Sequence, residues 1–233
     1  MDRYRTRPGG MCQIVMLFLA LVAACRPSDG RRADDLSAFY YPVDRLADQG
    51  VMYYYANVTD SLGGREVWKL RRVGDSVLQS ENLDAGGRVL LRQRDRVVSS
   101  GVITDSLTLL TYDSLGARAV GVTIHAGNRM PFNVADTLAV YLTHLEWWQP
   151  GDSLHLVLQR RRKFAGDTVW TWADKSLPAV RFTTFDQLET ERDGWTNSTW
   201  SGEEIYAEGV GLVYYARHIS PQFHLAFRLE KIE

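Results

Sequence analysis

The histidines are the residues of this sequence whose side chains could bind a metal ion or transfer a proton near neutral pH. There are five of them: His125, His144, His155, His218 and His224. No two are four residues apart, and the histidine and glutamate spacing of the zinc proteases is missing. His155 and His224 occupy the polar positions of alternating apolar stretches. We therefore expect solvent-exposed or hydrogen-bonded imidazoles, with no bound metal and no other cofactor.

Ser153 is the serine whose neighbours suggest a nucleophile. It lies in Gly151-Asp152-Ser153-Leu154, which resembles the nucleophile block of one esterase family. That family has its serine near the start of the chain and a histidine three residues after a late aspartate. Here the tetrapeptide is central, and no histidine follows Asp174, Asp186 or Asp193 at that spacing. A serine needs a base and an orienting acid to attack a substrate, so we expect that the chain is not an enzyme.

Cys25 has the sequence context of a lipid attachment site. Arg3, Arg5 and Arg7 precede eleven uninterrupted apolar residues, 14–24, which end in two alanines. This pattern is typical of a signal peptide, and the apolar run is too short to span a bilayer. A cysteine directly after the small residues resembles the lipobox of bacterial lipoproteins, in which the chain is cut before the cysteine and the cysteine is diacylated. An ordinary signal peptide beside an incidental cysteine is the alternative.

The count of cysteines agrees with lipidation. Of the two, Cys12 would leave with a signal peptide over residues 1–24, so a mature chain could form no internal disulfide. Residues 25–38 are polar, with proline and glycine, and predict a flexible tether. In the enterobacterial family an aspartate after the lipidated cysteine retains the protein at the inner membrane. Arg26 stands there, so the resemblance implies the outer membrane, with either face left open.

The tryptophans are candidates for an apolar binding cleft. Trp170 and Trp172 share one face of a predicted strand, and Trp147 and Trp148 end a predicted helix. Large aromatic side chains usually fill a core, so plain packing is the first interpretation. If both pairs lie at the mouth of a curved sheet, they line a cleft for an acyl chain or another hydrophobic ligand.

The elements that would position these residues are mostly strands. From residue 39 onward, apolar residues alternate with a period of two, which is typical of half-buried strands. Strands are expected over 51–55, 66–70, 77–83, 88–98, 102–112, 118–125, 154–164, 168–172, 179–186, 204–217 and 223–232. Short connections favour antiparallel hairpins. The sequence therefore predicts a mainly β protein, in which residues 39–233 form one strongly curved antiparallel sheet, an open or half barrel.

One stretch interrupts the alternation. Five apolar residues recur at helical spacing: Leu138, Tyr141, Leu142, Leu145 and Trp148. Asn133 or Asp136 can cap the start, and Pro150-Gly151 ends the segment. We expect one helix packed on the sheet. Another strand is the alternative, because Val140, Tyr141 and Leu142 also favour strands.

Composition and net charge limit the classes of molecule that the protein is expected to bind. The chain is 45% hydrophobic and 24% charged, which indicates a folded protein, and its net charge of −1 provides no general attraction to nucleic acid. Two basic clusters, one on alternate residues from Arg88 to Arg96 and one over 160–163, lie among acidic residues. We expect solvated sheet faces with cross-strand ion pairs.

The lipobox, the hairpins and the late helix together resemble the LolA/LolB-like bacterial envelope proteins. The likeness rests on Tyr40-Tyr41-Pro42 with Gly50-Val51-Met52-Tyr53-Tyr54, and on residues 136–145 followed by Pro150-Gly151-Asp152. The resemblance implies an unfinished barrel with helix on its concave side, and carrier members of the group bind the acyl chains of lipoproteins. No ligand-binding residue carries over to this sequence.

Three functions follow from these observations. The first is a membrane-anchored, non-enzymatic envelope lipoprotein that binds a hydrophobic small molecule or lipid in the sheet concavity. The second is a structural lipoprotein that docks an envelope protein partner, which predicts a filled core and an exposed apolar patch or sheet edge. The third is an esterase-like enzyme.

Overall fold

The computed structural model describes residues 35–46, 49–59, 64–114, 116–134, 138–149, 151, 154–172 and 174–233. Two short 3₁₀ helices come first, η1 (Ser37–Phe39) and η2 (Val43–Arg45). Twelve strands follow: β1 (Val51–Asn57), β2 (Glu66–Val73), β3 (Val77–Leu83), β4 (Val89–Val98), β5 (Gly101–Asp113), β6 (Gly116–Pro131), β7 (Val140–Gln149), β8 (Leu154–Trp172), β9 (Lys175–Glu191), β10 (Trp195–Ala207), β11 (Gly211–His218) and β12 (His224–Ile232). None of the described helices is long and apolar enough to cross a membrane.

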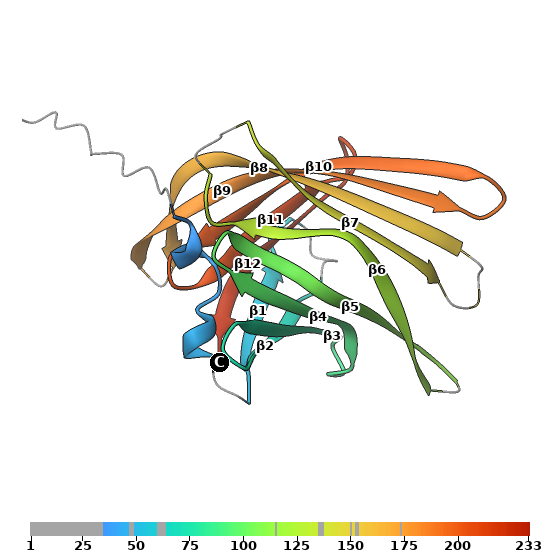
Figure 1. The fold of residues 1–233 in the computed structure, drawn as a ribbon, viewed down its shortest axis with the longest axis horizontal. Coiled ribbons are helices and arrows are strands. Elements are labelled where there is room, and N and C mark those ends of the chain that lie inside the picture. The colour runs from blue at the N-terminus through green and yellow to red at the C-terminus, as the bar shows by residue number, and fades with distance from the viewer. Residues whose placement is uncertain are drawn as a thin grey trace, which may run out of the picture. The chain divides into compact units, whose positions relative to one another are not determined.

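The strands form a closed antiparallel barrel (Figure 1). Each strand pairs with the next one along the chain, and β12 returns to pair with β1. This last ladder runs from Tyr53 opposite Ile232 to Asn57 opposite Phe227. Closure gives the backbone N–H and C=O groups of the first and last strands a partner that an open sheet would leave to water.

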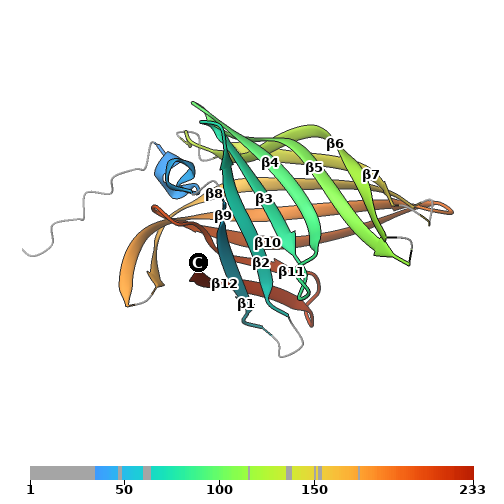
Figure 2. The same ribbon diagram turned by 90° about the horizontal axis from the view of Figure 1, so that it is seen from below.

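Residues 35–46 lie at one end of the barrel (Figure 2). Leu36, which the sequence placed in the tether, is fully buried, and its N–H donates to the carbonyl of Phe132 at 2.8 Å. The ring of Tyr41 packs against Gly211, where an added Cβ would lie 2.3 Å from the Tyr41 Cδ1. Gly211 has a φ of +97°, so this glycine permits both the backbone turn and the close approach of the ring.

The buried apolar residues gather around this same end. Phe39, Tyr40 and Val43 pack in one cluster with side chains from the strands, among them Tyr53 and Phe182. The Tyr53 hydroxyl donates to the carbonyl of Val210 at 3.1 Å. The N-terminal segment is therefore part of the core, and it covers one end of the barrel.

The predicted open sheet is wrong, because β1 and β12 meet and close it. Alternation along a strand tells which side chains face inward, but it does not tell whether the first and last strands pair. The LolA/LolB-like architecture that the resemblance implied fails for the same reason.

The predicted helix over residues 133–148 is also wrong, since its second half forms strand β7. All ten residues of β7 pair with β8, from Val140 opposite Lys163 to Gln149 opposite Leu154. This continuous ladder, together with the β-prone residues at its start, outweighs a helical spacing of five apolar residues. Among the residues that the structure describes, η1 and η2 are the only helices.

Two further strand predictions had the wrong extent. Residues 154–164 and 168–172 form one strand, β8, which continues through a bulge near Phe164. Residues 204–217 divide instead into β10 and β11, with a turn over 208–210. The tip of the β8–β9 hairpin extends past the neighbouring strands (Figure 2).

Candidate functional site

The interior of the barrel contains a cavity of about 300 Å³, a volume at the lower end of small-molecule sites. Its walls come from ten of the strands and from the N-terminal segment. Apolar lining side chains include Trp68, Leu91, Leu107, Leu109, Val122, Leu145, Trp147 and Leu158; polar ones include Tyr41, Gln93, Asp95, Thr104, Arg129, Thr143, Arg160, Arg162, Glu204 and Arg217.

These two kinds of side chain occupy different ends of the cavity. Along β8, Leu158 precedes Arg160 and Arg162, and on the facing strand β7 the polar Thr143 lies opposite Arg160 while Leu145 lies opposite Leu158. The polar end is the one that residues 35–46 cover, because Tyr41 lines it. The cavity thus has a polar, covered end and a remainder that is mostly apolar, with Glu66, Asn82 and Arg217 as polar lining residues.

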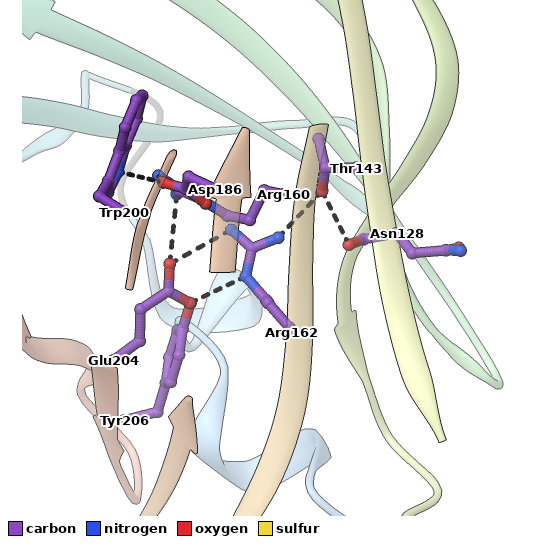
Figure 3. A network of polar contacts seen from close by, with 8 residues as sticks. All are labelled: Asn128, Thr143, Arg160, Arg162, Asp186, Trp200, Glu204 and Tyr206. Carbon is purple, nitrogen blue, oxygen red and sulfur yellow. Dashed lines mark hydrogen bonds and ion pairs between the residues drawn. The ribbon is translucent and has the colours of Figure 1, made fainter. Parts of the chain in front are cut away.

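Arg160 and Asp186 form a bidentate ion pair at the polar end. Arg160 donates from Nε and Nη2 to the two carboxylate oxygens of Asp186, at 2.7 and 2.6 Å. The Trp200 indole N–H donates to the same carboxylate at 2.8 Å (Figure 3). Asp186 is completely buried, so these three charge-assisted hydrogen bonds replace its water.

Arg162 and Glu204 form a second pair beside the first. Arg162 donates to the two oxygens of Glu204 at 2.9 and 3.2 Å, and its Nη1 donates to Thr143 at 2.9 Å. The Tyr206 hydroxyl donates to Glu204 at 2.9 Å, and Arg160 approaches it at 3.4 Å (Figure 3). Four strands, β7, β8, β9 and β10, are therefore joined by one buried polar network.

Asp95 is the centre of a third buried group. It accepts hydrogen bonds from Tyr40 at 3.0 Å, from Gln93 at 2.7 and 2.9 Å, and from Thr104 at 2.8 Å. Asp95 is only 2% exposed. Because Tyr40 belongs to the N-terminal segment, this carboxylate ties the cover of the barrel to β4 and β5.

Burial and neighbouring charges shift the pKa values of several side chains in and beside this network. Burial by itself would raise the pKa of Glu204, but Arg162 and Arg160 outweigh it and keep the pKa far below its ordinary value. Burial, and then Glu204, raise the pKa of Tyr206, so its hydroxyl remains a donor. Burial and Asp95 likewise raise the pKa of Tyr40. At neutral pH Glu204 is therefore charged, and the phenols of Tyr206 and Tyr40 are neutral.

The prediction that both basic clusters form solvated faces is wrong for Arg160 and Arg162, which point into the barrel and are paired there. It is confirmed on β4, where Arg92 pairs with Glu81 and Arg96 with Asp105 across strands. A signal for the inward pair existed in the sequence. Both arginines lie at even-numbered positions, as do Leu156, Leu158 and Phe164, so they share the apolar face of the same strand.

The four predicted cleft tryptophans do not gather at one place. Trp147 lines the cavity, whereas its neighbour Trp148 is 58% exposed and stacks on His155 with ring centroids 4.5 Å apart. Trp170 and Trp172 pack against the apolar cluster away from the cavity. The Arg228 guanidinium lies 5.0 Å from the Trp170 ring.

Two histidines contact one carboxylate on β7, and a third histidine lies beside one of them. Glu146 contacts the Nε2 atoms of His125 and His155 at 2.6 and 2.8 Å, and the rings of His125 and His144 are 4.7 Å apart. These hydrogen bonds lower the pKa of Glu146. His144 and Glu146 share a strand face rather than diverging on a helix. In the described part of the chain, no group of three or more side chains is arranged to hold a metal ion.

Two candidate residues lie outside the described residues: Cys25, the predicted lipidation site, and Ser153, the candidate nucleophile. A separate hollow of about 600 Å³ lies beside the N-terminal segment. Most of the side chains around it, such as Asp44, Arg45 and Glu208, are exposed, so it is a surface feature.

Similar folds occur among solved structures. A candidate exported protein with YmcC-like fold from Bacteroides fragilis superimposes with a TM-score of 0.54 and 14% identity, covering 84% of this chain and 99% of that one. A candidate lipoprotein from Parabacteroides distasonis gives 0.50 and 10%, with 84% and 98% covered. The hypothetical lipoprotein YmcC from Escherichia coli K12 gives 0.38 and 10%, with 81% and 88% covered.

At these identities the first two likenesses show a shared fold. No family model matches the sequence, and no curated protein matches it. The names of the neighbours place those proteins among exported proteins and lipoproteins, and they state no activity.

Proposed function

We propose that this protein is a non-enzymatic lipoprotein of the bacterial envelope that binds a hydrophobic ligand inside its barrel. The observation that carries the proposal is the cavity inside the barrel, with leucines and Trp147 along much of its wall and convergent polar groups at one end. Concave sites of this composition are typical of small-molecule binding.

The membrane attachment in this proposal rests on the lipobox-like sequence before Cys25. Two structural neighbours named as lipoproteins or exported proteins support it. We expect intact mass measurement of material from the membrane fraction to give a chain that starts at a diacylated Cys25. We expect the Cys25→Ala variant to be lost from the membrane fraction, because it cannot be diacylated and lasting attachment needs more than one acyl chain. An unmodified thiol at Cys25, or a mature chain that starts elsewhere, would contradict the anchor.

Ligand binding is tested by filling the cavity. Val122 lines it opposite Leu107, and the next residue, Thr123, is exposed and lies on the other face of β6. We expect Val122→Phe to weaken displacement of a fluorescent fatty acid by about tenfold, whereas Thr123→Phe leaves displacement unchanged. If the purified protein carries no lipid in native mass spectrometry and binds no fluorescent fatty acid, the binding function is wrong.

Partner docking is the second candidate, and one surface favours it. Trp148 and Trp195 are 58% and 57% exposed on either side of His155. Exposed aromatic residues are frequent at protein interfaces. The internal cavity counts against this candidate, since docking alone predicted a filled core. A photo-crosslinker at Trp148 that captures the same envelope protein as one at Val169, a distant exposed site, would contradict docking at this surface.

A further inference from the structure

Arg129 on β6 differs from the other arginines at the polar end of the cavity. Its side chain lines the cavity, and its Nε atom is buried without a hydrogen-bond partner. Within the described parts of the chain, Arg129 forms no ion pair and no hydrogen bond through its guanidinium. By contrast, Arg160 and Arg162 donate to Asp186, Glu204 and Thr143.

The carboxylates near Arg129 are already engaged by other donors. Asp95 accepts from Tyr40, Gln93 and Thr104, and Glu204 accepts from Arg162 and Tyr206. They act on Arg129 through their charge alone. Burial would lower the pKa of Arg129, but Tyr206, Glu204 and Asp95 together raise it, so the guanidinium keeps its proton.

A buried guanidinium N–H that donates to nothing is costly, because it has lost its water. The planar fork of an arginine matches the two oxygens of a carboxylate or phosphate. An acceptor that arrives with the ligand would complete the hydrogen bonds of Arg129, while the protein's own carboxylates stay as they are.

Beyond Arg129 the cavity wall is mostly apolar, although Glu66, Asn82 and Arg217 also line it. Leu91, Leu107, Leu109, Val122, Leu145 and Leu158 line it. A molecule that fills the whole space therefore needs an oxygen-rich head and a hydrocarbon tail. The volume of about 300 Å³ favours one chain over several.

We propose that the ligand is a single-chain anionic amphiphile, whose carboxylate or phosphate binds Arg129 and whose tail lies along the leucines. This inference rests on the proposed function and names the class of ligand. It also sets the direction of binding, with the head toward residues 35–46 and the tail toward the far end of the barrel.

Arg217 provides an internal comparison. It is the other arginine that lines the cavity without an ion pair among the described residues, and its guanidinium lies 5.8 Å from the ring centroid of Tyr215. Tyr215 donates a short hydrogen bond to Glu66, away from the Asp95 group. Replacing Arg217 therefore removes a cavity arginine of the same type from a different place.

The test is calorimetric titration of the lipid-stripped protein with dodecanoate, dodecyl phosphate, 1-dodecanol and dodecyltrimethylammonium. We expect both anions to bind roughly ten- to a hundredfold more tightly than the alcohol, and the cation to bind weakest. Arg129→Met should remove the preference for anions and leave the affinity for the alcohol unchanged. Arg217→Met, and Arg94→Met at an exposed position of β4, should keep the preference.

Arg129→Lys is the control for the case that Arg129→Met does not fold, since it keeps the positive charge beside Asp95 and Glu204. We expect this variant to bind the anions with intermediate affinity. Equal binding of all four probes, or a preference lost in Arg217→Met but kept in Arg129→Met, would overturn this inference while leaving the proposed function. Binding of none of the probes would overturn both.

Discussion

Arg162 on β8 and Glu204 on β10 are joined by two hydrogen bonds, of 2.9 and 3.2 Å, although β9 lies between their strands. The contact therefore passes over the inner face of β9. It holds two non-neighbouring strands at a fixed separation, and its polar surroundings include Thr143 and Tyr206.

Glu204→Gln should lower the free energy of unfolding at pH 7 by about 3 kcal/mol, because it leaves Arg162 and Arg160 facing a neutral group. Since the pKa of Glu204 is lowered on folding, its contribution is present above its ordinary pKa of about 4.3 and is lost as the pH falls below that value. Denaturant unfolding between pH 7 and pH 2 should therefore show wild type and variant converging in acid. A constant difference over this range would contradict the assignment.

Gly211→Ala, at the start of β11, should destabilise the protein more than Gly209→Ala in the preceding turn. Both glycines have positive φ, of +97° and +70°, so each alanine incurs backbone strain of about 1–2 kcal/mol. Only at Gly211 does the new methyl group meet the Tyr41 ring; at Gly209 nothing lies within 4 Å. We expect a further loss of about 1–3 kcal/mol at Gly211, measured by denaturant unfolding. Equal losses would show that the ring can move aside freely.

Trp200→Phe should cost about 1–2 kcal/mol, because the buried Asp186 loses a hydrogen-bond donor. Trp170→Phe should cost less than about 1 kcal/mol. The Trp170 Nε1 is buried without a partner among the described residues, so its removal breaks no hydrogen bond. Thermal unfolding of the two variants measures the contrast, and the reverse order would contradict it.

Trp147→Phe should reduce the change in tryptophan fluorescence when a fatty acid binds, because Trp147 and Trp68 are the tryptophans that line the cavity among the described residues. Trp148→Phe is the matched control, since the neighbouring side chain is exposed. A ligand signal that disappears in the control and persists in Trp147→Phe would place binding on the outer surface.

Local patterns predicted most of the strands. The strand expected over residues 77–83 is β3, with the same bounds, because alternation and flanking turns are both local. Barrel closure could not be predicted in this way, since the pairing of Tyr53 with Ile232 joins residues at opposite ends of the described sequence. For residues 140–149 the sequence allows both a helix and a strand, and it is the pairing with β8 that makes this segment a strand, β7.

The polar end of the cavity was missed for a different reason. Arginines and aspartates are usually exposed, so composition favoured a solvated face for Arg160 and Arg162. The alternation of side chains along β8 instead predicts that both arginines face inward. The same holds on β4, where Gln93 and Asp95 lie between Leu91 and Val97 on the inward side. Strict alternation was thus a better guide to orientation than residue type. Trp147 could be named from sequence, but its separation from Trp170 and Trp172 required the fold.

The seam between β1 and β12 has a consequence for how the chain acquires its shape. Strand β1 is synthesised early, yet its partner along one edge exists only once residues 224–232 have emerged. Until then the growing sheet has two open edges, whose backbone N–H and C=O groups have no strand to pair with and can pair with strands from other chains. Truncation within β12 would leave both edges without a partner, so the truncated chain should remain prone to self-association.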